Sequence, residues 1–117
     1  MGRLTTHVLD TAHGTPGSGI EVRLYRAGSR GYEIVKSMLT NADGRGDAPL
    51  LEGAAMIAGR YRLVFGAGAY FRRIGTTLAD PPFVDEVSLD FGIADVDAHY
   101  HVPLLVSPWS YSTYRGS

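Results

Sequence analysis

The C-terminal stretch His99-Tyr-His-Val-Pro-Leu-Leu-Val-Ser-Pro-Trp-Ser-Tyr-Ser-Thr-Tyr-Arg-Gly-Ser117 decides the fold. Its pattern indicates a strand, a tight turn and a second strand that ends with the chain. Successive side chains of a strand point to opposite faces of a sheet. One face of the first strand is uniformly apolar and should belong to the core: Tyr100, Val102, Leu104 and Val106. His99 and His101 lie on the other face, which core packing does not need.

The second strand of this hairpin continues the polar face with Ser110, Ser112 and Tyr114. Imidazoles, hydroxyls and a phenol therefore share one sheet surface, close to Arg115 and the terminal carboxylate. A solvent-facing sheet surface is usually covered by ordinary charged and polar residues. We interpret this departure as a catalytic or binding surface. The alternative is a solvated edge with incidental histidines.

The composition describes one domain, residues 1–117, with a modest core. Apolar residues make up 44% of the chain, too many for a disordered protein. The net charge of -1 argues against binding to nucleic acid or to an anionic membrane. The chain has no cysteine and no basic segment followed by an apolar run, and no apolar stretch approaches the length of a membrane span. We therefore expect a cytoplasmic protein without disulfides or thiolate metal sites.

Alternating apolar residues predict further strands along the chain. We expect them over residues 4–12, 20–26, 32–40, 59–65 and 84–91, with a short one at 47–51 and one or two helical turns within 66–75. Clusters of Gly, Pro, Asn and Asp separate these segments. About eight short strands with one short helix are typical of an all-β, two-sheet sandwich.

Two residues far from the C-terminal hairpin are further candidates for a functional site. His7 lies on the outward face of the strand over 4–12, since Thr6 and Val8 point to the opposite side. Arg45 lies at the tip of the turn Asn41-Ala-Asp-Gly-Arg-Gly46, where its guanidinium can project. Taken alone, His7 is explained as well as a surface or interface residue, and Arg45 is explained as well as a solvated residue at the tip of a turn.

Three separated motifs make the whole chain resemble a known family. They are the opening Leu4-Thr-Thr-His-Val-Leu-Asp10 with His13-Gly-Thr-Pro-Gly17, the loop Thr40-Asn-Ala-Asp-Gly-Arg45, and the ending Ser107–Ser117. All three are similar to motifs of the transthyretin-like superfamily.

The residues at four places favour one branch of that superfamily. His7, Arg45, His101 and the terminal tetrapeptide Tyr114-Arg-Gly-Ser117 resemble the set that marks the enzyme branch, the 5-hydroxyisourate hydrolases. The hormone-carrying transthyretins lack this set and continue past the tetrapeptide. The resemblance implies a transthyretin-like sandwich that pairs into dimers and then into a homotetramer, with active sites in a channel where two dimers meet.

The resemblance also implies a reaction that needs no cofactor. The substrate would be 5-hydroxyisourate, a small planar oxidised purine from urate. Hydrolysis at an amide-like carbonyl would open its six-membered ring and give 2-oxo-4-hydroxy-4-carboxy-5-ureidoimidazoline. Such a reaction requires an activated water, charge stabilisation on the carbonyl oxygen and a slot for the ring.

The implied roles fall on six residues. His7 and His101 would activate water and transfer protons, because histidine titrates near neutral pH. Arg45 would offset negative charge in the transition state, and Ser117, by its hydroxyl or its terminal carboxylate, would orient a histidine or water. His7 and Arg45 would also bind the substrate, together with Ser112 and Tyr114.

Three alternatives remain open at this stage. A carrier could hold a planar ligand in the same channel without turning it over, or the chain could be a purely structural sandwich domain. His99-x-His101 has a spacing that could chelate zinc, but no third protein ligand is evident, so we expect no metal. We expect His99 to be structural.

Overall fold

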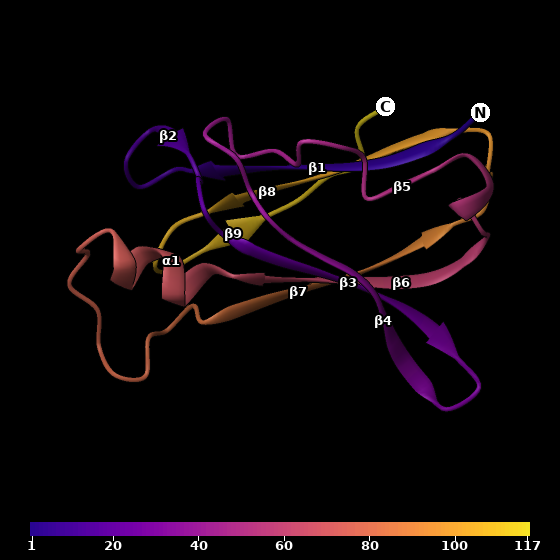
Figure 1. The fold of residues 1–117 in the computed structure, drawn as a ribbon. Helices are drawn as coiled ribbons and strands as arrows, with labels where there is room; N and C mark the ends of the chain where they lie inside the picture. Colours follow the sequence, from indigo (N-terminus) through magenta and orange to yellow (C-terminus); the bar gives the residue numbers. More distant parts are fainter.

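The computed structural model describes residues 1–117 and folds them into two stacked β-sheets, with one short helix at one end (Figure 1). One sheet holds β1 (Arg3–Asp10), β2 (Thr15–Pro16), β5 (Leu51–Glu52), β8 (His99–Val106) and β9 (Tyr111–Ser112). The other holds β3 (Glu21–Gly28), β4 (Gly31–Leu39), β6 (Gly59–Gly66) and β7 (Glu86–Ile93). A 3-10 turn, η1 (Gly53–Ala55), and the helix α1 (Ala67–Arg73) complete the fold. The predicted all-β sandwich with one short helix is confirmed.

The four-stranded sheet has the order β4-β3-β6-β7, and every pairing in it is antiparallel. β3, β6 and β7 bury side chains against the facing sheet, as the sequence predicts, whereas β4 at the edge has no buried residue. The buried residues of this sheet include Val22, Leu24, Tyr61, Leu63, Phe65, Val87 and Leu89. Burying such apolar surface is the main favourable contribution to folding.

The five-stranded sheet is organised around the pairing of the two ends of the chain. β1 runs parallel to β8 along its whole length, from Arg3 opposite His99 to Asp10 opposite Val106. The burial of β1 alternates residue by residue, and the one hydroxyl on its core face, that of Thr6, donates a hydrogen bond of 2.7 Å to the Val102 carbonyl. The opposite face of the β1–β8 pair is left for polar side chains.

The strand at the C-terminus is shorter than predicted. Only Tyr111 and Ser112 pair with β8 as β9, and the chain then meets β8 again through a bridge between Gly116 and His101. Continuing the register of β9 puts Tyr114 opposite Pro103, which has no backbone N–H to donate. Instead, the Thr113 hydroxyl donates to the Pro103 carbonyl at 2.7 Å. The ladder is interrupted at the proline. The expected strand at 47–51 is also reduced, to Leu51–Glu52.

A buried carboxylate ties the loop after β1 to the helix. Asp10 is 1% exposed, and its Oδ2 accepts hydrogen bonds from the Tyr70 hydroxyl and from His13 Nδ1, each at 2.8 Å. Its Oδ1 accepts from the backbone N–H groups of Ala12 and His13, each at 3.0 Å. Burial and the Asp10 carboxylate raise the pKa of Tyr70 to about 12. We call Asp10, His13 and Tyr70 the Asp10 cluster.

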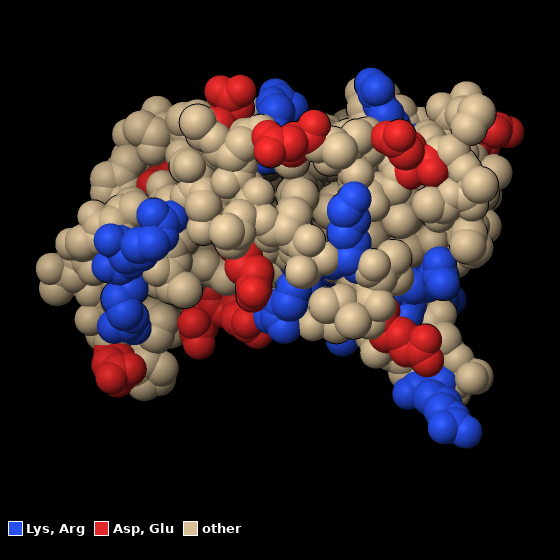
Figure 2. Space-filling model, viewed as in Figure 1, with Lys and Arg blue, Asp and Glu red and all other residues tan.

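Positive and negative side chains are interspersed over the face of the molecule shown in Figure 2, without a large area of one sign. This distribution agrees with the net charge of -1. None of the helices has the length and apolar character that crossing a membrane requires.

Candidate active site

The outward face of β1 and β8 brings together the histidines that the sequence singles out. Parallel pairing sets Thr5 opposite His101 and Arg3 opposite His99, while His7 follows on the same face of β1. The side chains of Thr5, His7, His99 and His101 are all partly exposed, as expected for the face that does not pack into the core. The strand alternation therefore predicts correctly which side chains face outward.

Arg45 reaches this face because its turn is fastened to β1. The Asn41 side-chain oxygen accepts hydrogen bonds from the backbone N–H groups of Asp43 and Arg45, at 2.9 and 3.1 Å. Gly44 has φ of 76°, and its carbonyl accepts a hydrogen bond of 2.8 Å from the Val8 N–H. A Cβ at position 44 would lie 2.4 Å from the Val8 carbonyl oxygen, so only glycine allows this approach. The turn thereby places Arg45 in a backbone bridge with His7.

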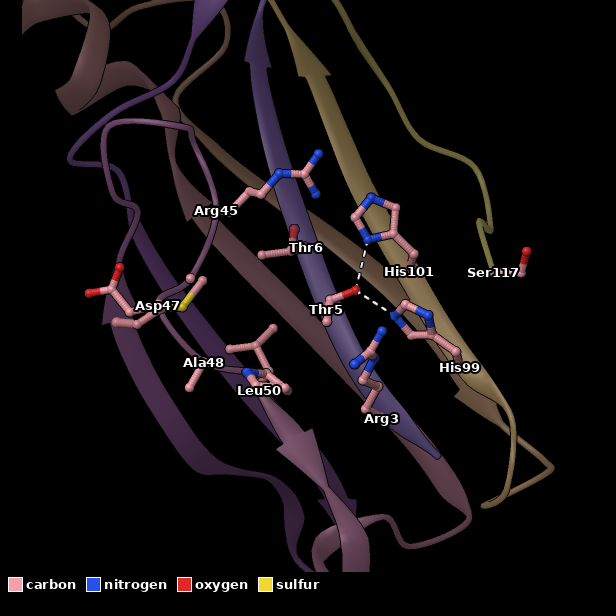
Figure 3. Close-up of a pocket in the computed structure, with 13 residues that line it drawn as sticks. Arg3, Thr5, Thr6, Arg45, Asp47, Ala48, Leu50, His99, His101 and Ser117 are labelled. Carbon is pink, nitrogen blue, oxygen red and sulfur yellow. Dashed lines mark hydrogen bonds between the residues drawn. The ribbon is translucent and has the colours of Figure 1, made fainter. Parts of the chain in front are cut away.

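A cavity of about 320 Å³ lies beside these residues. It is lined by Arg3, Thr5, His99 and His101 on the β1–β8 side, by the segment 45–50 on the other side, and by Ser117 at the chain end. In Figure 3, Arg45 extends from that segment across β1 toward His101. A cavity of this volume is in the range used by small-molecule sites.

The Thr5 hydroxyl lies between two imidazoles. Its Oγ1 is 2.8 Å from Nε2 of His99 and 2.8 Å from Nδ1 of His101, as the dashed lines in Figure 3 show. Both rings are therefore fixed in orientation by one side chain of the neighbouring strand. The second nitrogen of His101 points to the side of the ring away from Thr5 and is left for a water or a substrate.

The terminal tetrapeptide closes the other side of His101. Gly116 and His101 exchange two backbone hydrogen bonds, at 2.7 and 3.3 Å. A Cβ at position 116 would lie 3.1 Å from both Cβ and Cδ2 of His101, closer than side chains normally pack. Glycine at this position leaves room for the ring, and Ser117 follows directly into the lining of the cavity.

The electrostatic surroundings favour neutral histidines. Burial lowers the pKa of His7 and of His101, and the positive charge of Arg45 lowers both further. For His7, the backbone and carboxylate of Asp43 act in the opposite direction without reversing the shift. Burial also lowers the pKa of His99, with a further contribution from Arg3. A neutral imidazole is the form that accepts a proton.

The structure brings some of the predicted residues together and separates others. Arg45, His101 and Ser117 line one cavity; His7 does not line it but is paired with Arg45 through a backbone bridge. Ser112 and Tyr114 do not line it. Tyr114 instead lines a separate hollow with residues of β7, including Leu89 and Phe91, because the chain leaves the ladder at Pro103.

The sequence interpretation missed Thr5 and assigned His99 to structure alone. Both line the cavity, and they are hydrogen-bonded to each other. Their outward orientation follows from the alternation of each strand, but their contact depends on the parallel register of β1 and β8. No group of three or more His, Asp or Glu side chains is arranged to hold a metal ion.

Comparisons with known proteins give the site its context. Residues 4–116 match the model of the HIUase/Transthyretin family. The chain is 60% identical over 117 residues to a 5-hydroxyisourate hydrolase of Ralstonia nicotianae, covering 100% of both chains. It is 59% identical to a 5-hydroxyisourate hydrolase of Pseudomonas aeruginosa, covering 100% of this chain and 93% of that one.

Solved structures agree with this relationship. The crystal structure of an (S)-allantoin synthase superposes with a TM-score of 0.94 at 46% identity; the match covers 99% of this chain and 44% of that longer one. The 5-hydroxyisourate hydrolase of Klebsiella pneumoniae gives 0.82 at 39% identity, over 100% of both chains. Transthyretin of Sparus aurata gives 0.86 at 28% identity, over 97% and 96% of the two chains.

Proposed function

The chain belongs to the HIUase/Transthyretin family, and on this premise we propose that it is a hydrolase that opens the six-membered ring of 5-hydroxyisourate. The full-length relatives named for this activity support the reaction. The observation that carries the mechanism is the convergence of Arg45 and His101 on one cavity, with His7 beside Arg45.

We propose that His7 and His101 form the proton-transfer pair. A neutral imidazole takes a proton from water as the water oxygen bonds to the ring carbonyl carbon. The C–N bond then breaks, and a proton goes to the departing nitrogen. The product is a carboxylate, 2-oxo-4-hydroxy-4-carboxy-5-ureidoimidazoline, formed as a step of urate degradation. Burial and the charge of Arg45 lower the pKa of His7 and of His101, which supports this proposal because it favours the neutral form that accepts a proton.

Arg45 is the group placed to offset negative charge on the carbonyl oxygen. Its guanidinium carries a permanent charge and several donors, which suits an oxyanion in a partly enclosed site. Ser117, at the edge of the same cavity, contributes a hydroxyl, which we assign to orienting water or a histidine.

The assembly is the second part of the proposal. Within one chain, Ser112 and Tyr114 do not line the cavity, so their role in substrate binding requires a site completed by another copy. We propose a homotetramer, as the family resemblance implies, located in the cytoplasm. Light scattering on the protein eluting from a sizing column measures the assembly directly; a monomer would remove Ser112 and Tyr114 from the proposed site.

The activity is tested by generating 5-hydroxyisourate with urate oxidase and following the decay of its ultraviolet absorbance. We expect the protein to accelerate the decay in the presence of a chelator as well as in its absence. A carrier is the competing function, because a sea bream transthyretin of 28% identity has been solved with thyroxine. Binding of the planar substrate without faster decay would favour that alternative.

A further inference from the structure

The position of Thr5 has a consequence for the two histidines that it contacts. A threonine hydroxyl has one proton and can donate it to only one partner, although it can accept hydrogen bonds from others. Thr5 Oγ1 is 2.8 Å from His101 Nδ1 and 2.8 Å from His99 Nε2. If it donates to one imidazole, the other must donate to it. We propose that Thr5 is a positioning residue that couples the protonation of His101 to that of His99, so that His99 is the proton reserve behind His101.

The coupling allows two arrangements of the neutral rings. In the first, His101 carries its proton on Nδ1 and donates it to Thr5, and Thr5 donates to the lone pair on His99 Nε2. The free nitrogen of His101, Nε2, then has a lone pair and is a base. In the second, both hydrogen bonds run the other way and each neutral ring is the other tautomer. His99 donates from Nε2, Thr5 donates to His101 Nδ1, and Nε2 of His101 carries a proton and is an acid.

This arrangement lets His101 act as either the base or the acid of the pair that it forms with His7, and this step rests on the proposed function. When His101 Nε2 takes a proton from water, its Nδ1 proton passes to Thr5, and the threonine proton passes to His99 Nε2. The positive charge is then held on His99, farther from Arg45. The reverse shift returns a proton to His101 and, through its Nε2, to the departing ring nitrogen. The line gains one proton from water in the first shift and gives one to the ring nitrogen in the second, so that both histidines end neutral.

The backbone holds this line rigidly. Thr5 is opposite His101 in the β1–β8 ladder, and His101 is held against Gly116 on its other side. The charged groups that face the line are Arg3, Arg45 and Asp47 in the cavity, with His7 near Arg45. Arg45 and His7 both act on His101 and disfavour its protonated form, whereas Arg3 is the charged group that acts on His99.

Nuclear magnetic resonance of protein labelled with 15N in its histidines tests the coupling without substrate. Protonated and unprotonated ring nitrogens have well-separated shifts. We expect only one of the two nitrogens, His101 Nδ1 or His99 Nε2, to carry a proton in the neutral state, and we expect this pairing to be lost in Thr5→Val and kept in Thr5→Ser. Both nitrogens protonated, both unprotonated, or an unchanged pattern in Thr5→Val would overturn the proposal.

Kinetics test what the coupling does. We expect Thr5→Val to lower kcat by about 10- to 100-fold with KM changed by less than about twofold, as for loss of an outer-shell orienting partner. Thr5→Ser should restore most of the loss, and His99→Gln, which keeps a polar group but takes no proton, should match Thr5→Val. The matched control is Thr11→Val, because the Thr11 hydroxyl also bonds to β8, at the Val106 carbonyl, but outside the cavity.

The two measurements separate this proposal from the function on which it rests. If the wild-type protein does not hydrolyse 5-hydroxyisourate but shows the paired histidine tautomers, the coupling stands and the reaction is wrong. If hydrolysis is present and Thr5→Val has the same kcat as Thr11→Val, the positioning role of Thr5 is overturned. Equal kcat in His99→Gln and wild type would remove His99 as the proton reserve.

Discussion

The molecule holds its histidines in two different electrostatic settings. In the Asp10 cluster, His13 lies against a buried carboxylate, with Nδ1 2.8 Å from Asp10 Oδ2. On the outward face of β1 and β8, neither His99 nor His101 is hydrogen-bonded to a carboxylate, and both share the Thr5 hydroxyl instead. Guanidinium groups are the nearby charges that shift these rings.

The difference explains why only one setting is suited to proton transfer. The Asp10 carboxylate holds the His13 ring in place by a hydrogen bond, whereas an arginine near an imidazole favours its neutral form. The Asp10 cluster is also saturated with hydrogen bonds, since Asp10 accepts from Tyr70, His13 and two backbone groups. We therefore regard the Asp10 cluster as structural and the β1–β8 face as reactive.

The largest expected effect comes from removing the reactive histidines. His7→Ala and His101→Ala should each lower the turnover of 5-hydroxyisourate by about 100- to 10,000-fold, because each removes a group that transfers a proton in the transition state. The absorbance assay measures this, at equal protein concentration and with the assembly checked by light scattering.

His13→Ala is the matched control for these substitutions. It removes a histidine from the Asp10 cluster and should leave turnover within about threefold of wild type, because surface changes away from a site have small effects. Near-normal turnover in His7→Ala or His101→Ala would show that the substituted histidine does not transfer a proton in the reaction. A loss in His13→Ala as large as theirs would contradict the separation of the two settings.

The orientation of the reactive histidines toward the outward face is predictable from alternation within single strands. Period-two patterning correctly places His7 and His101 on outward faces, because a strand has only two faces. It likewise places on the core side Tyr100, Val102, Leu104 and Val106. The Asn41–Gly46 turn is likewise predicted by local turn chemistry, and it carries Arg45 to the site.

The remaining features depend on pairing between distant segments, which alternation does not specify. Thr5 and His101 are 96 residues apart, and only the parallel register of β1 and β8 puts them in contact. The position of Tyr114 also depends on pairing, because the missing N–H of Pro103 interrupts the ladder opposite it. Residues whose function depends on register are those that the sequence interpretation missed.

The second prediction changes the charge beside the reactive histidines. Burial and then Arg45 lower the pKa of His7 and His101, so their neutral forms persist to lower pH than in a free histidine, whose pKa is about 6.5. In wild type, kcat/KM should fall on the acid side with a midpoint below that value. In Arg45→Gln, kcat/KM should drop by about 100- to 1000-fold, as for loss of an oxyanion-stabilising donor.

The pH profile of Arg45→Gln tests whether the positive charge of Arg45, rather than its shape, sets the pKa of the nearby histidines. Removing a positive charge removes one of the causes that lower the histidine pKa values, so the acid-side midpoint should move to higher pH. Arg30→Gln, in the exposed turn between β3 and β4, is the control and should leave both kcat/KM and its acid-side midpoint unchanged. A midpoint in Arg45→Gln that stays at the wild-type value, or moves to lower pH, would show that Arg45 does not set the protonation of the site.

The smallest effect on activity should come from the Asp10 cluster. Asp10→Asn keeps an oxygen for the backbone groups of Ala12 and His13 but puts an amide where the Tyr70 hydroxyl and His13 Nδ1 need an acceptor. We expect the free energy of unfolding to fall by about 1–3 kcal/mol, the cost of unsatisfied buried hydrogen-bonding groups. Urea unfolding at fixed protein concentration measures it, since the midpoint of an oligomer depends on concentration.

Turnover of the Asp10→Asn protein, assayed well below its unfolding transition, should stay within about twofold of wild type. Tyr70→Phe serves as a graded comparison, because it removes one donor to Asp10 and leaves the others, and it should cost about 1 kcal/mol. A protein with unchanged stability and tenfold lower turnover would mean that the buried carboxylate communicates with the β1–β8 face. The Asp10 cluster and the β1–β8 face would then be coupled, and the carboxylate would have to act through β1, the strand that both share.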